Sequence, residues 1–245
     1  MCESMRMNTR IFEDGEELSR AALDGLLGIM NDAVKERGRF AIALAGGHTP
    51  AKLYQMWARG EKTGAQTPWE RVHLFWGDER YVAPSDPASN YRMVRESLIA
   101  RVPIPQENVH PMPTDAPRPE KAAEAYEAEL GRFFGAGAPA FDLQLLGLGV
   151  EGHTASLFPG SPALEEKVRR VAAVVAPANP PQRLTLTLPV LNQGRNTFFL
   201  VAGADKRAII AALQGESAER SSRYPAARVQ PSGPVVWFLD KAAAE

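Results

Sequence analysis

The chain has 245 residues, 44% of them hydrophobic and 23% charged, which fits one soluble globular domain spanning residues 1–245. Its 28 basic and 29 acidic side chains nearly cancel, which excludes a surface charged strongly enough to hold nucleic acid or an anionic membrane. A single cysteine, no signal peptide and no apolar stretch of ~20 residues together predict a cytoplasmic protein without disulfides or membrane segments.

Helix-like and strand-like segments alternate along the chain. Up to residue 119 they are a helix at 16–35, a strand at 40–44, a helix opened by Thr49 as N-cap and Pro50, a strand at 72–76, a loop at 82–90, a helix to about 100 and a proline-rich connection. Beyond it they are a helix at 121–134, strands at 141–146, 171–176, 184–188 and 197–201, a helix at 205–213 and a strand at 235–239.

This alternation predicts an α/β fold, a mainly parallel Rossmann-like sheet with helices on both faces. In such sheets ligands bind outside the carboxyl ends of the strands. Glycine-rich segments follow the strands that end near residues 44, 76 and 146. We therefore expect a binding site where these segments meet.

The first such segment is Ala45-Gly46-Gly47-His48-Thr49. Its two glycines let the backbone approach a ligand closely. The helix that follows offers unpaired N–H groups and the positive end of its dipole, which suit a phosphate. The same glycines would also serve a tight turn without a ligand, so the segment alone leaves both interpretations open.

The second segment, Gly77-Asp78-Glu79-Arg80, places two carboxylates and a guanidinium at a strand end. Adjacent side chains point in different directions, so the two acids need not form an acid–base pair. Arg80 is the better candidate, as a clamp for an anion. The alternative is an ordinary surface ion cluster.

The third segment, 147–160, contains a formal G-x-G-x-x-G that ends at Gly152. We do not expect a dinucleotide site, because that fingerprint belongs to the first strand–helix turn of its unit and Pro159-Gly160 prevents a long helix here. What remains is His153 in a glycine-rich loop at a strand end. Histidine titrates near neutrality, so His153 is a candidate general base, against the alternative of a structural histidine.

Two further cations and several missing motifs narrow the chemistry. Arg183 opens a strand and Lys206 lies where a strand passes into a helix, a position that suits a phosphate; each could also be an ordinary surface cation. The sequence has no G-x-S-x-G elbow and no Walker lysine motif. Its four histidines are dispersed, which gives a zinc site little support, and Cys2 lies too near the terminus to be expected as a catalytic thiol.

Read in order, these segments resemble 6-phosphogluconolactonases over nearly the whole chain. The resemblance rests on residues 46–50, 76–80, 89–91 and 146–159, continued by Arg183 and Lys206. It implies a fold of the sugar-phosphate isomerase/deaminase type, a monomer, no metal or organic cofactor, and hydrolysis of 6-phospho-D-glucono-1,5-lactone to 6-phosphogluconate. His153 would be the general base, with Glu151 as its partner carboxylate. The substrate and its phosphate would be bound by Gly46, Gly47, His48, Thr49, Asp78, Arg80, Asn90, Gly152, Arg183 and Lys206.

Two alternatives stay open. Glucosamine-6-phosphate deaminases, in the same superfamily, resemble the chain in the Gly-Gly-x-Thr-Pro loop and a Gly-His pair. They carry Asp-Glu-Tyr and Ala-Phe-Asn-Glu-Pro where this chain has Asp78-Glu79-Arg80 and, at 155–159, Ala-Ser-Leu-Phe-Pro. A deaminase would need a carboxylate base, such as Asp78. A non-catalytic sugar-phosphate sensor would bind the product without turnover and would not require His153 as a base.

Overall fold

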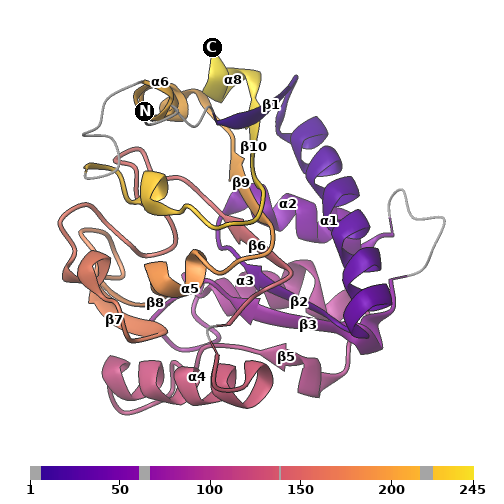
Figure 1. The fold of residues 1–245 in the computed structure, drawn as a ribbon, viewed down its shortest axis with the longest axis vertical. Helices are drawn as coiled ribbons and strands as arrows, with labels where there is room; N and C mark the ends of the chain where they lie inside the picture. The colour runs from indigo at the N-terminus through magenta and orange to yellow at the C-terminus, as the bar shows by residue number, and fades with distance from the viewer. Residues whose placement is uncertain (1–6, 61–66, 138, 216–222) are drawn as a thin grey trace.

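The computed structural model describes residues 7–60, 67–137, 139–215 and 223–245 (Figure 1), so Cys2 lies outside the described residues. Seven parallel strands form the central sheet, in the order β1-β10-β9-β6-β2-β3-β5. They are β1 (Asn8–Phe12), β2 (Phe40–Leu44), β3 (Val72–Trp76), β5 (Val109–His110), β6 (Leu143–Leu146), β9 (Thr197–Val201) and β10 (Val235–Asp240). The predicted parallel sheet is confirmed, with β1 and β5 as edge strands that the sequence did not suggest.

Helices cover both faces of this sheet (Figure 1). They are α1 (Gly15–Arg37), α2 (His48–Ala58), α3 (Asn90–Ser97), α4 (Pro119–Phe134), α5 (Leu188–Leu191), α6 (Arg207–Gln214) and α8 (Lys241–Ala244). On one face Phe198 lies against α1, where a Cβ at Gly25 would meet its ring at 3.0 Å. On the other face the neighbouring Thr197 contacts Gln144, whose amide donates to the carbonyl of Leu191 in α5 at 2.6 Å. Successive strand residues thus face different helices, as the pleat requires.

Local sequence explains the longest helix. The Asp14 carboxylate accepts hydrogen bonds from the N–H groups of Glu16 and Glu17, and Gly38 ends α1 in the left-handed region at φ 72°. Buried residues between them recur at helical spacing and face the core. The expected helix over 16–35 is therefore confirmed, with one extra residue at its start and two at its end.

The opening of the second helix differs from the prediction. The helix α2 begins at His48, its N-cap is Gly47 at φ 102°, and no side chain caps it. Thr49 is thus already helical, and Pro50 is the third helical residue. The prediction of Thr49 as N-cap is wrong because the positive φ of Gly47, which suits glycine, makes the turn two residues earlier.

A second, smaller sheet lies beside the central one. Its antiparallel strands are β4 (Asp78–Arg80), β8 (Gln182–Leu186) and β7 (Val171–Val175), in the order β4-β8-β7. The polar run 78–80 does not look like a strand, and it becomes one only by pairing with a segment about 100 residues away. This pairing sets Arg80 directly opposite Arg183.

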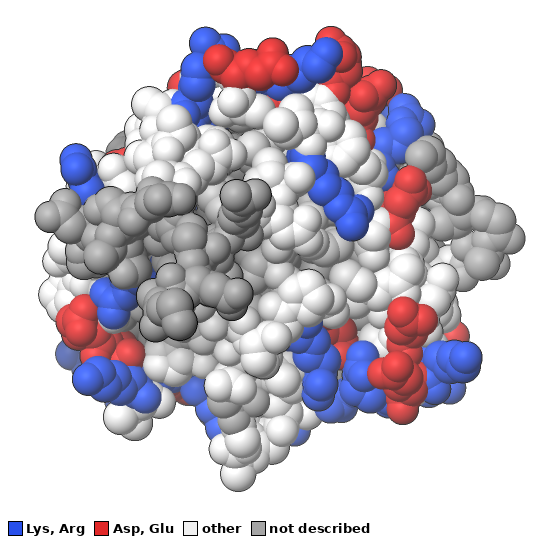
Figure 2. All heavy atoms as spheres, turned by 45° about the horizontal axis from the view of Figure 1, so that its top comes forward, with Lys and Arg blue, Asp and Glu red and all other residues white. Residues whose placement is uncertain are grey.

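The described surface carries mixed charge. Figure 2 shows acidic and basic side chains interspersed over one face of the molecule, consistent with the formal net charge of −1. Across the described ranges, no helix combines the length and the hydrophobicity needed to cross a bilayer.

Candidate active site

A cavity of about 250 Å³ opens at the carboxyl ends of β2, β3 and β6. Residues from segments far apart in the sequence line it: Leu44, Ala45, Gly46, Gly47, Gly77, Asp78, Arg80, Asn90, Leu145, Leu146, Gly147, Leu148, Gly149, His153, Ala155, Arg183 and Lys206. Eight of the predicted site residues are among them. The place is the one expected for a ligand in an open parallel sheet.

Four predicted site residues are not on the wall of this cavity. His48 is exposed and Thr49 is half-buried, both in the first turn of α2. Gly152 is buried and turns the loop at φ 85°, where a Cβ would lie 2.6 Å from the ring of Tyr224. Glu151 lies beside His153 and reaches the cavity only through it.

The loop that carries His153 is held by its own backbone and by side chains. The carbonyl of His153 accepts from the N–H of Gly149 at 2.9 Å, and Thr154 Oγ1 donates to the carbonyl of Gly147 at 2.9 Å. Ala155, on the cavity wall, has a positive φ of 46°, which is strained for a residue with a Cβ. Together these contacts fix the loop in one shape.

The position of the His153 imidazole is fixed by its neighbours. Its ring stacks on Phe158 with the centroids 4.2 Å apart, and it covers Gly149 so closely that a Cβ there would lie 1.9 Å from Nδ1. Glu151 Oε1 lies 3.0 Å from Nδ1, an ion-pair distance, but the angles do not make a hydrogen bond, so buried Nδ1 has no hydrogen-bond partner in the described part of the chain. The contact between Glu151 and His153 is therefore electrostatic in this structure.

Two arginines form the cationic side of the cavity. Arg80 donates from Nη1 to the carbonyl of Ala88 at 2.7 Å, and Arg183 donates from Nε to the carbonyl of Pro180 at 2.7 Å. Among the described residues, neither has a carboxylate within ion-pair distance, and Arg80 Nε is buried without a partner. Burial lowers the pKa of Arg183, and the nearby charge of Arg80 lowers it further. Two partly desolvated guanidinium groups side by side leave a strong positive potential for an anion.

Lys206, which follows β9 in the chain, is the third cation of the cavity. It ends a short 3-10 turn, Ala204–Lys206, directly after the strand, and its Nζ lies 3.0 Å from Asp205 Oδ2. Its side chain is only 21% exposed, so part of its charge is available inside the cavity. The sequence-based placement of Lys206 at a strand-to-helix junction is confirmed.

Asp78 links the two halves of the cavity. Its Oδ2 accepts from Ser156 Oγ at 2.6 Å, which ties β4 to the His153 loop, and its carbonyl accepts from Asn90 Nδ2 at 3.0 Å. Asn90 in turn lies against Gly46, where a Cβ would be 2.0 Å from its Oδ1. The role of Ser156 was not predicted, because nothing in the local sequence signals a partner 78 residues away.

In the part of the chain that the structure describes, no three His, Cys, Asp or Glu side chains come together in a way that could hold a metal ion. The histidines His73 and His110 lie next to each other, with Nδ1 and Nε2 3.3 Å apart, and His110 Nδ1 is 2.7 Å from Glu129. Burial lowers the pKa of both histidines, that of His73 to about 4. Neither lines the cavity.

Comparison with known proteins supplies the family. The family model of "Glucosamine-6-phosphate isomerases/6-phosphogluconolactonase" matches residues 13–237. A 6-phosphogluconolactonase of Synechocystis sp. is 47% identical over 216 residues, 87% of each chain, and one of Nostoc sp. is 40% identical over 98% of each chain. The solved 6-phosphogluconolactonase of Trypanosoma brucei superposes with a TM-score of 0.84 at 31% identity, covering 98% of both chains. The chain therefore belongs to the family of glucosamine-6-phosphate isomerases and 6-phosphogluconolactonases.

Proposed function

We propose that the protein hydrolyses 6-phospho-D-glucono-1,5-lactone to 6-phosphogluconate, as a cytoplasmic monomer whose residues 1–245 form one domain. The observation that carries this proposal is the cavity itself, which sets Arg80, Arg183 and Lys206 around the same space as His153. A substrate with an anionic group at one end and an ester at the other fits that arrangement. The relatives named 6-phosphogluconolactonase support the choice of this substrate within the family.

In this mechanism His153 is the general base. Its Nδ1 lies against Glu151, whose negative charge stabilises the imidazolium that forms, so Nε2 is the nitrogen that takes a proton from water. The water oxygen bonds to the C1 carbonyl carbon, and the resulting oxyanion is stabilised by backbone N–H groups of a glycine-rich loop or a nearby cation. The bond from C1 to the ring oxygen then breaks, and the imidazolium returns the proton to that oxygen.

Binding energy at the phosphate would place the lactone for this attack. We assign the phosphate to Arg183, Lys206 and the start of α2, with Arg80 and Asn90 at the phosphate or the sugar. The wall positions of Arg80, Asn90, Arg183 and Lys206 support this assignment. The charge of the phosphate would offset the mutual repulsion of Arg80 and Arg183, which have no carboxylate partner within the described residues.

The deaminase alternative has less support from the geometry. Its proton abstraction at C2 needs a free carboxylate, whereas Asp78 is 8% exposed and already accepts from Ser156 at 2.6 Å. The relatives cited above are all lactonases, although the family description covers both activities.

The test is a rate measurement against the spontaneous reaction. The lactone is generated by enzymatic oxidation of glucose-6-phosphate, and 6-phosphogluconate is followed with and without the protein, with EDTA in a parallel run. We expect a rate well above background that EDTA leaves unchanged. Turnover at the background rate with tight 6-phosphogluconate binding would point to a sensor, and ammonia release from glucosamine-6-phosphate would point to a deaminase.

A further inference from the structure

Glu79 is a buried carboxylate next to the cavity that the proposed mechanism does not use. Its side chain is 1% exposed, it does not line the cavity, and no Lys, Arg or His of the described residues pairs with it. Burying a carboxylate without a cation is unfavourable unless hydrogen bonds replace its water. The groups that supply those hydrogen bonds therefore indicate what Glu79 does.

Four donors from two segments surround this carboxylate. Oε1 accepts from the N–H groups of Arg80 and Asn90, both at 2.7 Å, while Oε2 accepts from the N–H of Tyr91 at 2.6 Å and from Ser89 Oγ at 3.3 Å. One side chain thus joins β4 to the N-terminus of α3 and closes the intervening loop at its base. Its negative charge also suits the positive end of the helix dipole.

Two of the residues held by Glu79 present polar groups to the cavity. Arg80 and Asn90 both lie on its wall, and both are bonded to Glu79 through their backbone N–H groups. The Asn90 side chain fits against Gly46 and donates to the carbonyl of Asp78, so it has little freedom to compensate for a backbone shift. The His153 loop is tied instead to Asp78 through Ser156.

We propose that Glu79 is a positioning residue, which sets Arg80 and Asn90 for substrate binding without touching the substrate. This inference rests on the proposed function and deepens it. Because Glu79 does not hold the His153 loop, its loss should weaken binding far more than it slows the chemical step. The expected signature is a rise in KM with kcat nearly unchanged.

The test variant is Glu79→Gln, which keeps the size of the side chain but replaces one acceptor oxygen by an amide NH2. At least one backbone N–H then loses its partner, and a hydrogen bond to a charged group is worth ~1.5–3 kcal/mol. We expect KM for the lactone and the calorimetric Kd for 6-phosphogluconate to rise by about tenfold or more, with kcat within about threefold.

The matched control is Glu129→Gln on α4. Glu129 also accepts side-chain hydrogen bonds, from Arg132 and His110, but it has no bond to a residue of the cavity wall. We expect wild-type KM and Kd for this variant. Equal values of KM and Kd for Glu79→Gln and the wild type would overturn the positioning role, as would a loss confined to kcat.

Ser89→Ala is the milder variant if Glu79→Gln does not fold. It removes the longest of the four bonds to Glu79, at 3.3 Å, and we expect KM to rise by about two- to fourfold. An unchanged KM would contradict the positioning role. Wild-type turnover at the spontaneous rate would contradict the proposed function itself, which separates the two failures.

Discussion

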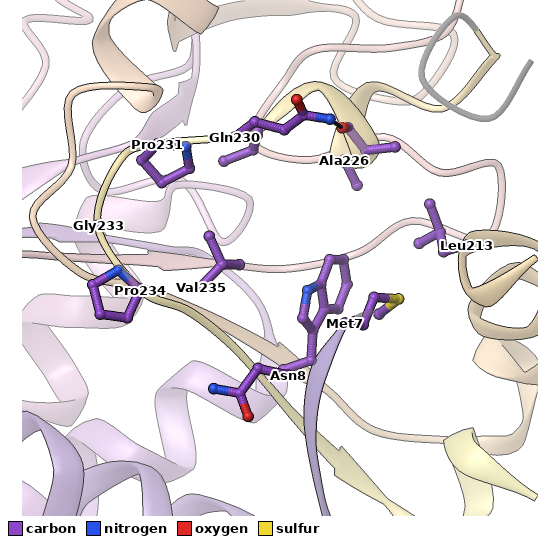
Figure 3. Close-up of a pocket in the computed structure, with 12 residues that line it drawn as sticks. Met7, Asn8, Leu213, Ala226, Gln230, Pro231, Gly233, Pro234 and Val235 are labelled. Carbon is purple, nitrogen blue, oxygen red and sulfur yellow. Dashed lines mark hydrogen bonds between the residues drawn. The ribbon is translucent and has the colours of Figure 1, made fainter. Parts of the chain in front are cut away.

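Two cavities of this molecule lie at opposite ends of the strands of the central sheet and differ in chemistry. The cavity of about 250 Å³ at the carboxyl ends of the strands holds His153, Asp78 and three cations. A larger one, of about 310 Å³, lies at the amino ends of β1 and β10 (Figure 3). Among the described residues, none of those that line it carries a charged side chain. The lining residues are Met7, Asn8, Leu213, Ala226, Ala227, Val229, Gln230, Pro231, Gly233, Pro234, Val235 and Trp237.

The difference shows that volume does not identify the active site of this fold. What distinguishes the smaller cavity is its charge: His153 shares the wall with three cations, and among the described residues neither Arg80 nor Arg183 has a carboxylate within ion-pair distance. Two cations held opposite each other are unfavourable for folding, so a protein retains such a pair where a ligand or a reaction needs it. The larger cavity carries no charged side chain among the described residues that line it.

The largest expected effect is the loss of the base. Replacing His153 by Ala should lower kcat by ~10²–10⁴-fold and leave KM within a few-fold, since general base catalysis supplies that factor. Steady-state rates on the lactone, corrected for the spontaneous reaction, check this. Gln230→Ala, an exposed position on the wall of the larger cavity, serves as the control and should behave as wild type. A kcat within threefold of wild type in His153→Ala would contradict the assignment of the base.

Gly149→Ala should disturb the same step without removing the imidazole. The new Cβ would lie 1.9 Å from His153 Nδ1, so the ring must move, and a displacement of ~1 Å can lower a rate by about 10²-fold. We expect kcat to fall by ~10–100-fold. The matched control is Gly28→Ala, exposed on α1 with nothing within 4 Å of its added Cβ; it should keep full activity and gain about 0.5–1 kcal/mol of stability. Equal rates for the two variants would disprove the steric argument.

Arg183→Met should separate binding from stability. We expect KM to rise by about 10–100-fold, the value of one or two hydrogen bonds to a charged group. The thermal unfolding midpoint should not fall, because Arg183 is 6% exposed and lies opposite another cation, Arg80, in the β4–β8 pair. A lowered midpoint with an unchanged KM would mean that the arginine pair serves the fold rather than a ligand.

The last expected effect concerns stability rather than rate: a pH dependence of the free energy of unfolding at Glu79. Burial raises the pKa of Glu79 to about 7 from 4.5, although the backbone hydrogen bonds oppose this and Asp78 adds to it. The folded chain then binds the proton more tightly than the unfolded chain. The contribution of Glu79 to the free energy of unfolding is therefore complete below pH ~4.5 and is lost as the pH rises to about 7, by up to ~3 kcal/mol.

Urea unfolding of wild type and Glu79→Gln at pH 5, 6, 7 and 8 measures this. The stability of the wild type relative to the variant should decrease with rising pH, since Asp78, Arg80 and Arg183 are present in both proteins. An increase with pH would show that the hydrogen bonds outweigh burial and that the pKa of Glu79 is lowered.

Much of the architecture follows from local pattern. The apolar runs at 40–44 and 72–76, each followed closely by glycine, predicted buried parallel strands. The carboxyl ends of the predicted strands then indicated where Gly46, Arg80 and His153 would lie close together. These signals are readable because a buried strand and the turn after it are set by neighbouring residues.

The remaining features depend on contacts between distant segments. The strand at 78–80 exists only through its pairing with 183–185, and the bond between Asp78 and Ser156 joins β4 to a loop 78 residues away. From the sequence, Glu79 could belong to an ordinary surface ion cluster, whereas burial and four donors make it a link between β4 and α3. No local propensity encodes such partners.

The most direct test of the central claim is a crystal structure of the protein with 6-phosphogluconate. We predict the phosphate beside Arg183, Lys206 and the start of α2, and the C1 carboxylate next to His153, in the cavity at the carboxyl ends of β2, β3 and β6. A ligand bound in the larger apolar cavity, or a phosphate remote from Arg183 and Lys206, would contradict the account.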